Sequence, residues 1–265
     1  MKKPITLIKL GGSLITDKTK PFTVKQKSLD LIASEVKKAT ETGTPLIIGH
    51  GAGSFGHIPA KKYQTHKGMI QKDSLEGIVA VADATRQLNA IVMRALLAAG
   101  VKAVAISPMS MSIADNFELG GIFTDSLEKL VELGIVPVVY GDQVVDVTRG
   151  CAVFSTEKVL AFIGLALQKK KYSIERIIHC GQTNGVYDAD GNTIDTISNR
   201  SFPEIKSVLS GSAGIDVTGG MLQKVEETLA LAQAGIPGLI IDGIEHGSLS
   251  KAIAGEEVLG TKIIA

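Results

Sequence analysis

A stretch rich in glycine and histidine, Gly49–His57, follows directly after the short apolar run Pro45–Ile48. Glycine lacks a Cβ and tolerates positive φ, so backbone N–H groups in such a stretch can crowd against an anion. A helix starting there would aim its positive end at the same point. A tight strand-to-helix turn without a ligand is the alternative. The stretch therefore predicts a strand that ends in a phosphate-binding loop.

Similar short apolar runs alternate with segments of helical periodicity along the whole chain. Strands are predicted over 5–10, 45–48, 101–107, 135–140, 144–147, 152–154, 176–180, 238–241 and 261–264. Helices are predicted over 24–40, 58–66, 75–99, 125–133, 155–167 and 249–254, and one more follows residues 216–221 and runs through 234. This alternation predicts an α/β fold, a three-layer αβα sandwich around a mainly parallel sheet, with ligands at the carboxyl ends of the strands. We expect one continuous sheet with two lobes, 1–175 and 176–265.

Charge and composition exclude several classes of function. The 28 basic and 27 acidic residues give a net charge of +1, so no overall field recruits nucleic acid or an anionic membrane. Tryptophan is absent and aromatic residues make up 4% of the chain, which disfavours a base-stacking surface. No apolar run approaches the ~18 residues of a membrane span. Cys151 and Cys180 lie in or beside apolar stretches, as buried thiols do in a reducing compartment, so we expect a cytoplasmic protein.

Four polar motifs are expected at the same edge of the sheet. They are Lys9-x-Gly11-Gly12-Ser13, the Gly49–His57 stretch, Gly141-Asp142 with Ser155-Thr156-Glu157, and Thr218-Gly219-Gly220-Met221-x-x-Lys224. A lysine inside a strand, such as Lys9, is anomalous unless it faces a polar site. Lys224 lies near a helix start, against the preference of the helix dipole, which favours a bound anion there. Glycine loops and separated cations can hold two phosphate groups in line, which is the main requirement of phosphoryl transfer.

Other familiar motifs do not fit. The chain has no Gly-x-x-x-x-Gly-Lys-Ser/Thr loop and no Gly-x-Ser-x-Gly elbow, which disfavours a P-loop enzyme and a serine hydrolase. The string Gly51-x-Gly53-x-x-Gly56 matches a dinucleotide motif, but it follows the second strand rather than the first. Asp188-x-Asp190 lacks the glutamate of a calcium loop, and neither cysteine has metal-ligand spacing, so we expect no metal ligands from the protein.

Taken together, the motifs resemble those of a known superfamily of kinases. Four stretches, in order, resemble the amino acid kinase superfamily: Lys9–Ser13, Gly49–His57, Pro137–Asp142 and Asp216–Met221. Within it, the chain is most similar to the isopentenyl phosphate kinases, through His57 at the end of the glycine loop and Lys18 after the first glycine pair. Fosfomycin kinases look similar in the same stretches. The resemblance extends from Lys9 to the last strand.

The resemblance implies transfer of the γ-phosphoryl group of ATP to isopentenyl phosphate by a homodimer, with Mg²⁺ held by phosphates and water. The lobe 1–175 would bind the acceptor phosphate and the lobe 176–265 the nucleotide. The catalytic residues implied are Lys9, Lys18, His57, Glu157 and Lys224. Those implied for ATP are Lys9, Gly11, Gly12, Ser13, Gly53, Gln182, Gly219, Gly220 and Lys224, and those for the acceptor are Gly51, Ala52, Gly53, His57 and Thr156. His50 is expected to be structural.

Two motifs depart from the pattern of that superfamily. Its members usually have Ser-Gly-Asp where this chain has Ser155-Thr156-Glu157, so the carboxylate is one methylene longer. Their Thr-Asp-Val-Asp-Gly-Val becomes residues 181–186 here, with Gln182 and Asn184 in place of two acids, which leaves the nucleotide preference open. A phosphonate or carboxylate acceptor, or a nucleotide-binding regulatory protein without turnover, are the alternative functions.

Overall fold

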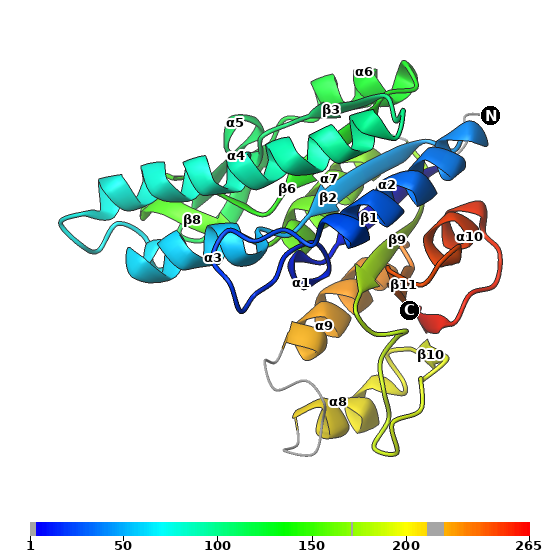
Figure 1. Ribbon diagram of the computed structural model, residues 1–265. Coiled ribbons are helices and arrows are strands. Elements are labelled where there is room, and N and C mark those ends of the chain that lie inside the picture. The colour runs from blue at the N-terminus through cyan, green and yellow to red at the C-terminus, as the bar shows by residue number, and fades with distance from the viewer. Residues whose placement is uncertain (1–3, 171, 211–219) are drawn as a thin grey trace.

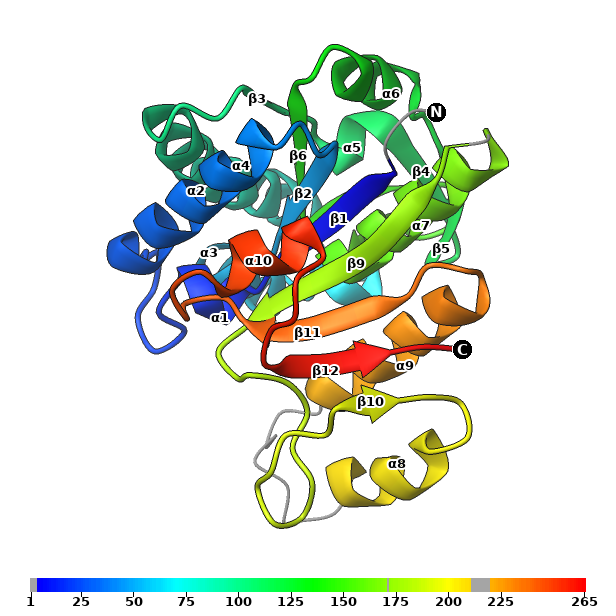
Figure 2. The same ribbon diagram turned by 90° about the vertical axis from the view of Figure 1, so that its right-hand side faces the viewer.

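A central sheet organises the computed structural model, which describes residues 4–170, 172–210 and 220–265. Among these residues, eight strands pair in the order β10-β12-β11-β9-β1-β2-β6-β3 (Figure 2). The strands are β1 Ile5–Leu10, β2 Leu46–His50, β3 Ala103–Ala105, β6 Val136–Tyr140, β9 Ile174–Gly181, β10 Thr196–Ile197, β11 Gly238–Asp242 and β12 Gly260–Ile263. All neighbours are parallel except β11 and β12. Because β9 pairs with β1, the sheet runs unbroken across residue 175.

Helices cover both faces of this sheet (Figure 1). One face carries α1 Gly12–Ile15, α2 Gln26–Glu41, α3 Gly53–Lys62, α4 Ser74–Ala98 and α10 Ser248–Ala254. The other carries α6 Asp125–Glu132, α7 Thr156–Lys169 and α9 Gly220–Gln233, with α8 Phe202–Ser210 beside α9. The short elements α5 Pro108–Met111 and η1 Thr65–Lys67 complete the helices of the described ranges. The predicted α/β sandwich with a mainly parallel sheet is confirmed.

Side chains of β1 alternate between the two apolar cores, as the period of two in a strand requires. Ile8 and Leu10 pack into the core under α2, α4 and α10, whereas Ile5 and Leu7 face the core under α7. Lys9 therefore points to the α7 face, where its cross-strand neighbour His179 is also buried. Lys9 can be buried inside β1 because α7 places the carboxylate of Glu157 opposite it.

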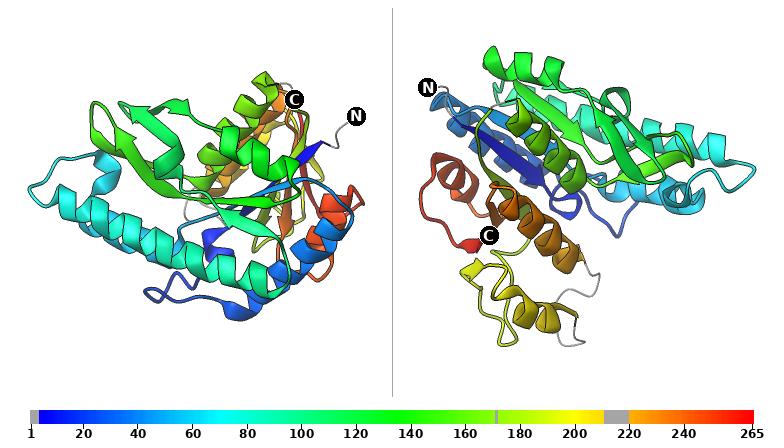
Figure 3. Two further views of the ribbon diagram at one scale, coloured as in Figure 1. Left: turned by 90° about the horizontal axis from the view of Figure 1, so that it is seen from above. Right: turned by 180° about the vertical axis from the view of Figure 1, so that it is seen from behind.

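A second sheet of four strands lies on the α7 side of the molecule, opposite the long helix α4 (Figure 3). Its order is β5-β4-β7-β8, with β4 Ser112–Asp115, β5 Glu118–Ile122, β7 Asp142–Asp146 and β8 Gly150–Phe154. The predicted hairpin around Gly150 and the excursion over 116–124 are both present. The sequence did not predict that these four strands form one separate sheet, because nothing local in a strand says which other strand it pairs with.

The carboxyl ends of four neighbouring strands meet in a row of glycines. Gly11, Gly51, Gly141 and Gly181 end or directly follow β1, β2, β6 and β9. Their backbones are linked across the strands: the N–H of Gly11 donates to Cys180 O at 2.9 Å, that of Gly51 to Leu10 O at 2.9 Å, and that of Gly141 to His50 O at 2.9 Å. The row leaves open space above the sheet where side chains would otherwise stand.

The predicted start of the helix over 58–66 is wrong, because α3 begins at Gly53 and ends at Lys62. Glycine has a low helix propensity, which suggested a loop up to Ile58. Packing overrides this preference: a Cβ on Gly56 would lie 2.6 Å from Ala52 Cβ and 3.1 Å from Thr85 Cγ2. Glycine at this position allows α3 to lie close against α4, and the glycine-rich motif becomes the first turn of a helix.

Candidate active site

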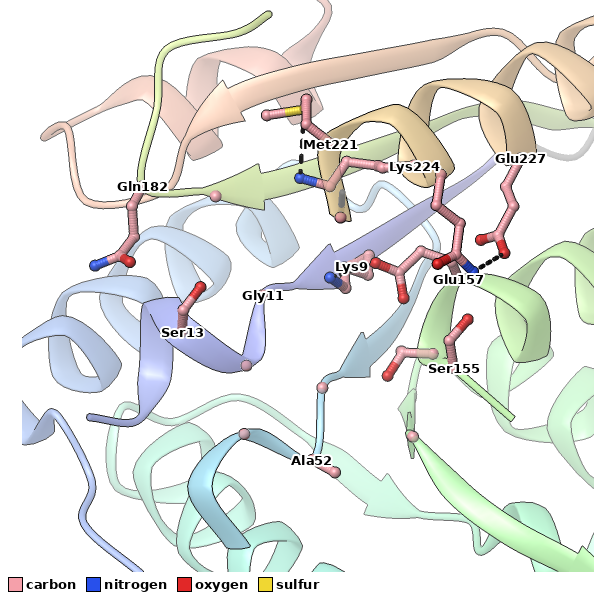
Figure 4. A pocket seen from close by; sticks show the side chains of 18 of the residues that line it. Lys9, Gly11, Ser13, Ala52, Ser155, Glu157, Gln182, Met221, Lys224 and Glu227 are labelled. Carbon is pink, nitrogen blue, oxygen red and sulfur yellow. Dashed lines mark hydrogen bonds and ion pairs between the residues drawn. The ribbon is translucent and has the colours of Figure 1, made fainter. Parts of the chain in front are cut away.

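One cavity of about 900 Å³ opens above the row of glycines (Figure 4). Every described residue of the predicted site lines it: Lys9, Gly11, Gly12, Ser13, Lys18, Gly51, Ala52, Gly53, His57, Thr156, Glu157, Gln182, Gly220 and Lys224. Gly219 lies outside the described residues. Residues from β1, α1, α3, α7, α9 and four connecting segments are thus brought together, although they span more than two hundred positions of the sequence.

Two glycine loops, Gly11–Ser13 after β1 and Gly51–Gly53 after β2, touch each other on the floor of the cavity. A Cβ on Gly12 would lie 2.8 Å from Gly53 N, and a Cβ on Gly51 would lie 2.7 Å from Gly12 N. Gly53 also has φ near +50°, a conformation that glycine adopts without strain. Backbone N–H groups after β1 and β2 therefore lie close enough together to contact two adjacent phosphate groups.

Lys9 forms an ion pair with Glu157 in the wall of the cavity. The distance from Lys9 Nζ to Glu157 Oε1 is 2.5 Å, and the two side chains are 10% and 16% exposed. Glu157 belongs to the first turn of α7, whose N-cap Ser155 accepts a hydrogen bond from Lys158 N at 3.2 Å. Burial favours the protonated form of Glu157, but the Lys9 ammonium outweighs this effect and holds the pKa of the carboxyl well below its ordinary value. Glu157 is therefore a carboxylate at neutral pH.

Lys224 approaches the same space from α9. A Cβ on Gly181 would lie 3.9 Å from Lys224 Nζ, and the ammonium contacts Met221 Sδ at 3.8 Å (Figure 4). One turn further along α9, Glu227 also lines the cavity, and burial together with the charge of Glu157 raises its pKa. Glu227 was not predicted from the sequence, although its spacing of three from Lys224 puts both residues on one face of a helix.

His57 and Lys18 stand together at another part of the cavity. His57 is an exposed residue of α3, and Lys18 lies in the loop after α1. Surrounding protein atoms lower the pKa of His57, and the Lys18 ammonium lowers it further. These two side chains therefore offer donors to an anion from two separate elements.

Apolar side chains continue the cavity beyond His57. Ala60, Val81 and Phe154 line it there, and Val81 and Phe154 are almost fully buried. Asp142 lies in the same wall and accepts a hydrogen bond from Thr85 Oγ1 at 2.9 Å. Burial raises the pKa of Asp142 to about 6. The cavity thus has a cationic, glycine-lined part and a more apolar part.

His50 supports the floor of the site from below. Its Nδ1 lies 3.2 Å from Gly51 O and its Nε2 lies 3.1 Å from Asn89 Nδ2, so the ring donates at Nδ1 and accepts at Nε2. The ring also stacks on Tyr140, with centroids 5.6 Å apart. Burial lowers the pKa of His50 to about 4, so the ring is neutral and acts as a support rather than an anion donor.

The two departures from the expected motifs have different surroundings. Thr156 donates from Oγ1 to His50 O at 2.7 Å, so a contact with a bound phosphate would come from its backbone N–H. Asn184 accepts from Thr193 Oγ1 at 2.9 Å and holds its own loop together, whereas Gln182 lines the cavity. Of the two positions where an acid is replaced, position 182 is therefore the one that lines the cavity.

Two kinds of feature are absent from the part of the chain that the structure describes. Within 4–170, 172–210 and 220–265, no three His, Cys, Asp or Glu side chains gather so as to hold a metal ion. In the same part of the chain, no helix combines the length and the apolar character needed to cross a membrane.

Known proteins match this chain along almost its entire length. A profile described as the amino acid kinase family matches residues 4–242. The isopentenyl phosphate kinase of Methanothermobacter thermautotrophicus is 34% identical over 97% of this chain and 98% of its own. The isopentenyl phosphate kinase of Methanocaldococcus jannaschii is 31% identical over 98% of each chain.

Solved structures agree with the sequence matches. An X-ray structure of an isopentenyl phosphate kinase superposes with a TM-score of 0.82 at 31% identity, covering 98% of this chain and 99% of that one. The product complex of the isopentenyl phosphate kinase from T. acidophilum superposes with a TM-score of 0.75 at 20% identity, which is a likeness of fold.

Proposed function

The chain belongs to the amino acid kinase family and, within it, to the isopentenyl phosphate kinases, and we propose that it transfers the γ-phosphoryl group of ATP to isopentenyl phosphate. One observation carries this proposal beyond the likeness to relatives. The two glycine loops touch each other within a cavity that holds the Lys9–Glu157 pair and Lys224, and also His57 with Lys18. This arrangement fits a donor and an acceptor phosphate side by side.

The nucleotide phosphates would lie over the first glycine loop. Backbone N–H groups of Gly12 and Ser13 would contact them, since that of Gly11 already donates to Cys180 O, with Lys9 and Lys224 as point charges on either side and Gln182 and Gly220 nearer the nucleoside. Glu157 would act on Lys9, because the 2.5 Å ion pair fixes where the ammonium stands. Lys9 is 8% exposed, so a partner that holds it in one place matters more than on the surface.

The acceptor phosphate would lie over the second glycine loop. Ala52 and Gly53 would provide backbone donors and His57 a side-chain donor, because the Gly51 N–H already donates to Leu10 O, while Lys18 would meet the transferring group from the opposite side. The apolar wall at Ala60, Val81 and Phe154 gives the isopentenyl chain a place away from water. An acceptor with a phosphate at one end and a short apolar chain at the other matches both parts of the cavity.

Transfer then needs little covalent work from the protein. A terminal oxygen of the acceptor phosphate forms a bond to the γ-phosphorus, and the bond from that phosphorus to the β–γ bridging oxygen breaks, leaving ADP. Lys9, Lys18 and Lys224 would stabilise the charge that spreads over the transferring oxygens. We propose that Mg²⁺ enters with ATP on its phosphates, where it neutralises part of their charge.

An ADP-release assay tests the function. With ATP and Mg²⁺ present, we expect turnover of isopentenyl phosphate, weaker turnover of dimethylallyl phosphate, and none of fosfomycin or N-acetylglutamate. Lys9→Met should abolish release, whereas Lys37→Met, in α2 outside the cavity and paired with Glu41, should not. Turnover of fosfomycin or N-acetylglutamate in place of the isoprenoid phosphates would show that the acceptor belongs to another chemical class. No turnover of any acceptor would refute the proposed function.

The acceptor role of His57 has its own test. His57→Ala should raise the KM of isopentenyl phosphate far more than that of ATP, and His246→Ala, an exposed histidine outside the cavity, should change neither. An equal rise for both substrates would show that His57 does not belong to the acceptor site. We further propose a cytoplasmic homodimer, and light scattering of the purified protein would measure its mass in solution.

A further inference from the structure

Thr16 connects the two glycine loops through a single hydroxyl group. Its Oγ1 donates to Gly12 O at 2.7 Å and accepts from Ser54 N at 3.0 Å, and the residue is fully buried. One hydrogen bond thus reaches the loop after β1, and the other reaches the first turn of α3 after β2. We propose that Thr16 is a positioning residue that fixes the distance between the donor and acceptor phosphates, an inference that rests on the function proposed above.

The side chain of Thr16 fills the space beside Gly53, where a side chain on residue 53 would stand. A Cβ on Gly53 would lie 2.2 Å from Thr16 Oγ1 and 2.7 Å from Thr16 Cγ2. Thr16 and Gly53 are therefore matched in shape, and the hydroxyl and methyl groups of Thr16 together take the place of the absent side chain. A shift of Thr16 would move Gly53, which lies against Gly12.

The Ser54 bond replaces a missing helix cap. An α-helix begins with N–H groups that have no partner within the helix, and a capping side chain usually accepts from one of them. The N-cap of α3 is Ala52, which has no side-chain acceptor. Thr16, which directly follows α1 and lies 38 positions before Ser54, supplies that acceptor. The start of α3 is therefore held by the end of α1 and not by a side chain of its own N-cap.

The same contact reaches the loop that carries Lys18. Thr23 N donates to Ser54 Oγ at 3.3 Å, and Asp17 N donates to Thr23 O at 2.9 Å, closing the loop over residues 17–23. Ser54 thus contacts Thr16 through its backbone and Thr23 through its side chain. Both glycine loops and the base of the Lys18 loop form one connected unit around the Thr16 hydroxyl.

This unit matters because in-line transfer depends on distance. Reacting atoms must approach to about 3–3.5 Å, and a misplacement of about 1 Å costs on the order of 100-fold in rate. Gly12 and Gly53 set how far apart the two phosphates lie, and Thr16 holds Gly12 and the residue after Gly53. Loss of its hydroxyl should therefore lower kcat more than it weakens the binding of either substrate alone.

A pair of Thr16 substitutions separates the hydroxyl from the shape. Thr16→Val keeps the volume and removes both hydrogen bonds, and we expect kcat to fall about 10- to 100-fold while each KM changes by less than about threefold. Thr16→Ser keeps the hydroxyl and should restore most of kcat. The matched control is Thr124→Val, which removes a buried hydroxyl that bonds Glu128 at 2.6 Å outside the cavity, and should leave kcat unchanged.

Failure of the proposed function and failure of the positioning role of Thr16 give different results. Wild-type protein that does not turn over isopentenyl phosphate refutes the proposed function. Active wild-type protein whose Thr16→Val variant keeps its kcat, or whose Thr16→Ser variant loses as much as Thr16→Val, refutes the positioning role. If Thr16→Val does not fold, amide hydrogen exchange of the wild-type protein decides: the Ser54 N–H should be strongly protected without ligand, and exchange at the rate of a free amide would overturn the inference.

Discussion

Substituting His50 tests whether a buried neutral histidine supports the site, and the result can be estimated from its surroundings. Burial lowers the pKa of His50 from its ordinary 6.5 to about 4. Below pH ~6.5 the unfolded chain binds a proton at this residue that the folded protein does not, so the free energy of unfolding falls as the pH drops. Between about pH 8 and about pH 5 this loss amounts to about 2 kcal/mol.

Urea unfolding of the wild-type protein and of His50→Gln at these two pH values measures that loss. Glutamine stays neutral, so the variant should lose about 2 kcal/mol less between the two pH values than the wild type. Any constant cost of the substitution cancels in this difference. Two other buried groups also make the free energy of unfolding depend on pH. Burial lowers the pKa of His179 to about 3, which destabilises the fold as the pH drops, and raises that of Asp142 to about 6, which has the opposite effect. Both residues are present in both proteins, so their contributions cancel in the comparison. Equal losses in the two proteins would refute the argument.

Three further predictions follow from the same site. Glu157→Gln leaves Lys9 buried without its counter-charge, so we expect the free energy of unfolding to fall by about 3–5 kcal/mol and kcat to fall strongly. Both losses should be larger than those of Glu157→Asp. Unchanged urea unfolding curves would contradict this prediction. Burial raises the pKa of the Cys180 thiol to about 12, so iodoacetamide should label it only after unfolding, and rapid labelling of the native protein would show that the thiol is accessible. Gly12→Ala should abolish turnover, because its Cβ would lie 2.8 Å from Gly53 N, whereas Gly120→Ala, whose nearest contact would be 3.5 Å, should be tolerated in the same assay.

Strand positions were predictable where a strand is buried on both faces. The run 5–10 matches β1 because uninterrupted apolar sequence between turn residues has few other interpretations. The order of the strands was not predictable, since β1 lies between β2 and β9 and neither pairing leaves a local signal. The four-stranded sheet was not predicted for the same reason, since nothing local in its strands says which of them pair.

The composition of the candidate site was more predictable than its internal contacts. Glycine pairs and lysines at strand ends are visible as motifs, and the described ones line one cavity. Thr16 gave no such signal, because its partners Gly12 and Ser54 lie 4 and 38 positions away and a threonine after a helix is ordinary. Glu227 was overlooked because a glutamate on a helix is usually at the surface. Residues that act through other residues depend on packing, which periodicity does not describe.

The motif Ser155-Thr156-Glu157 departs from the family pattern at two adjacent positions, Thr156 and Glu157, whose contacts are linked. A Cβ on Gly49 would lie 2.6 Å from Thr156 Cγ2, so the threonine occupies space above β2 that the absent side chain leaves, and its hydroxyl binds His50 O at 2.7 Å. The start of α7 is thereby tied to the end of β2. From this position the longer side chain of Glu157 still reaches Lys9 at 2.5 Å. The two substitutions therefore belong together, since Thr156 fixes where α7 begins and Glu157 spans the remaining distance to Lys9. Changing both residues to the usual Gly-Asp should consequently preserve more activity than either change alone.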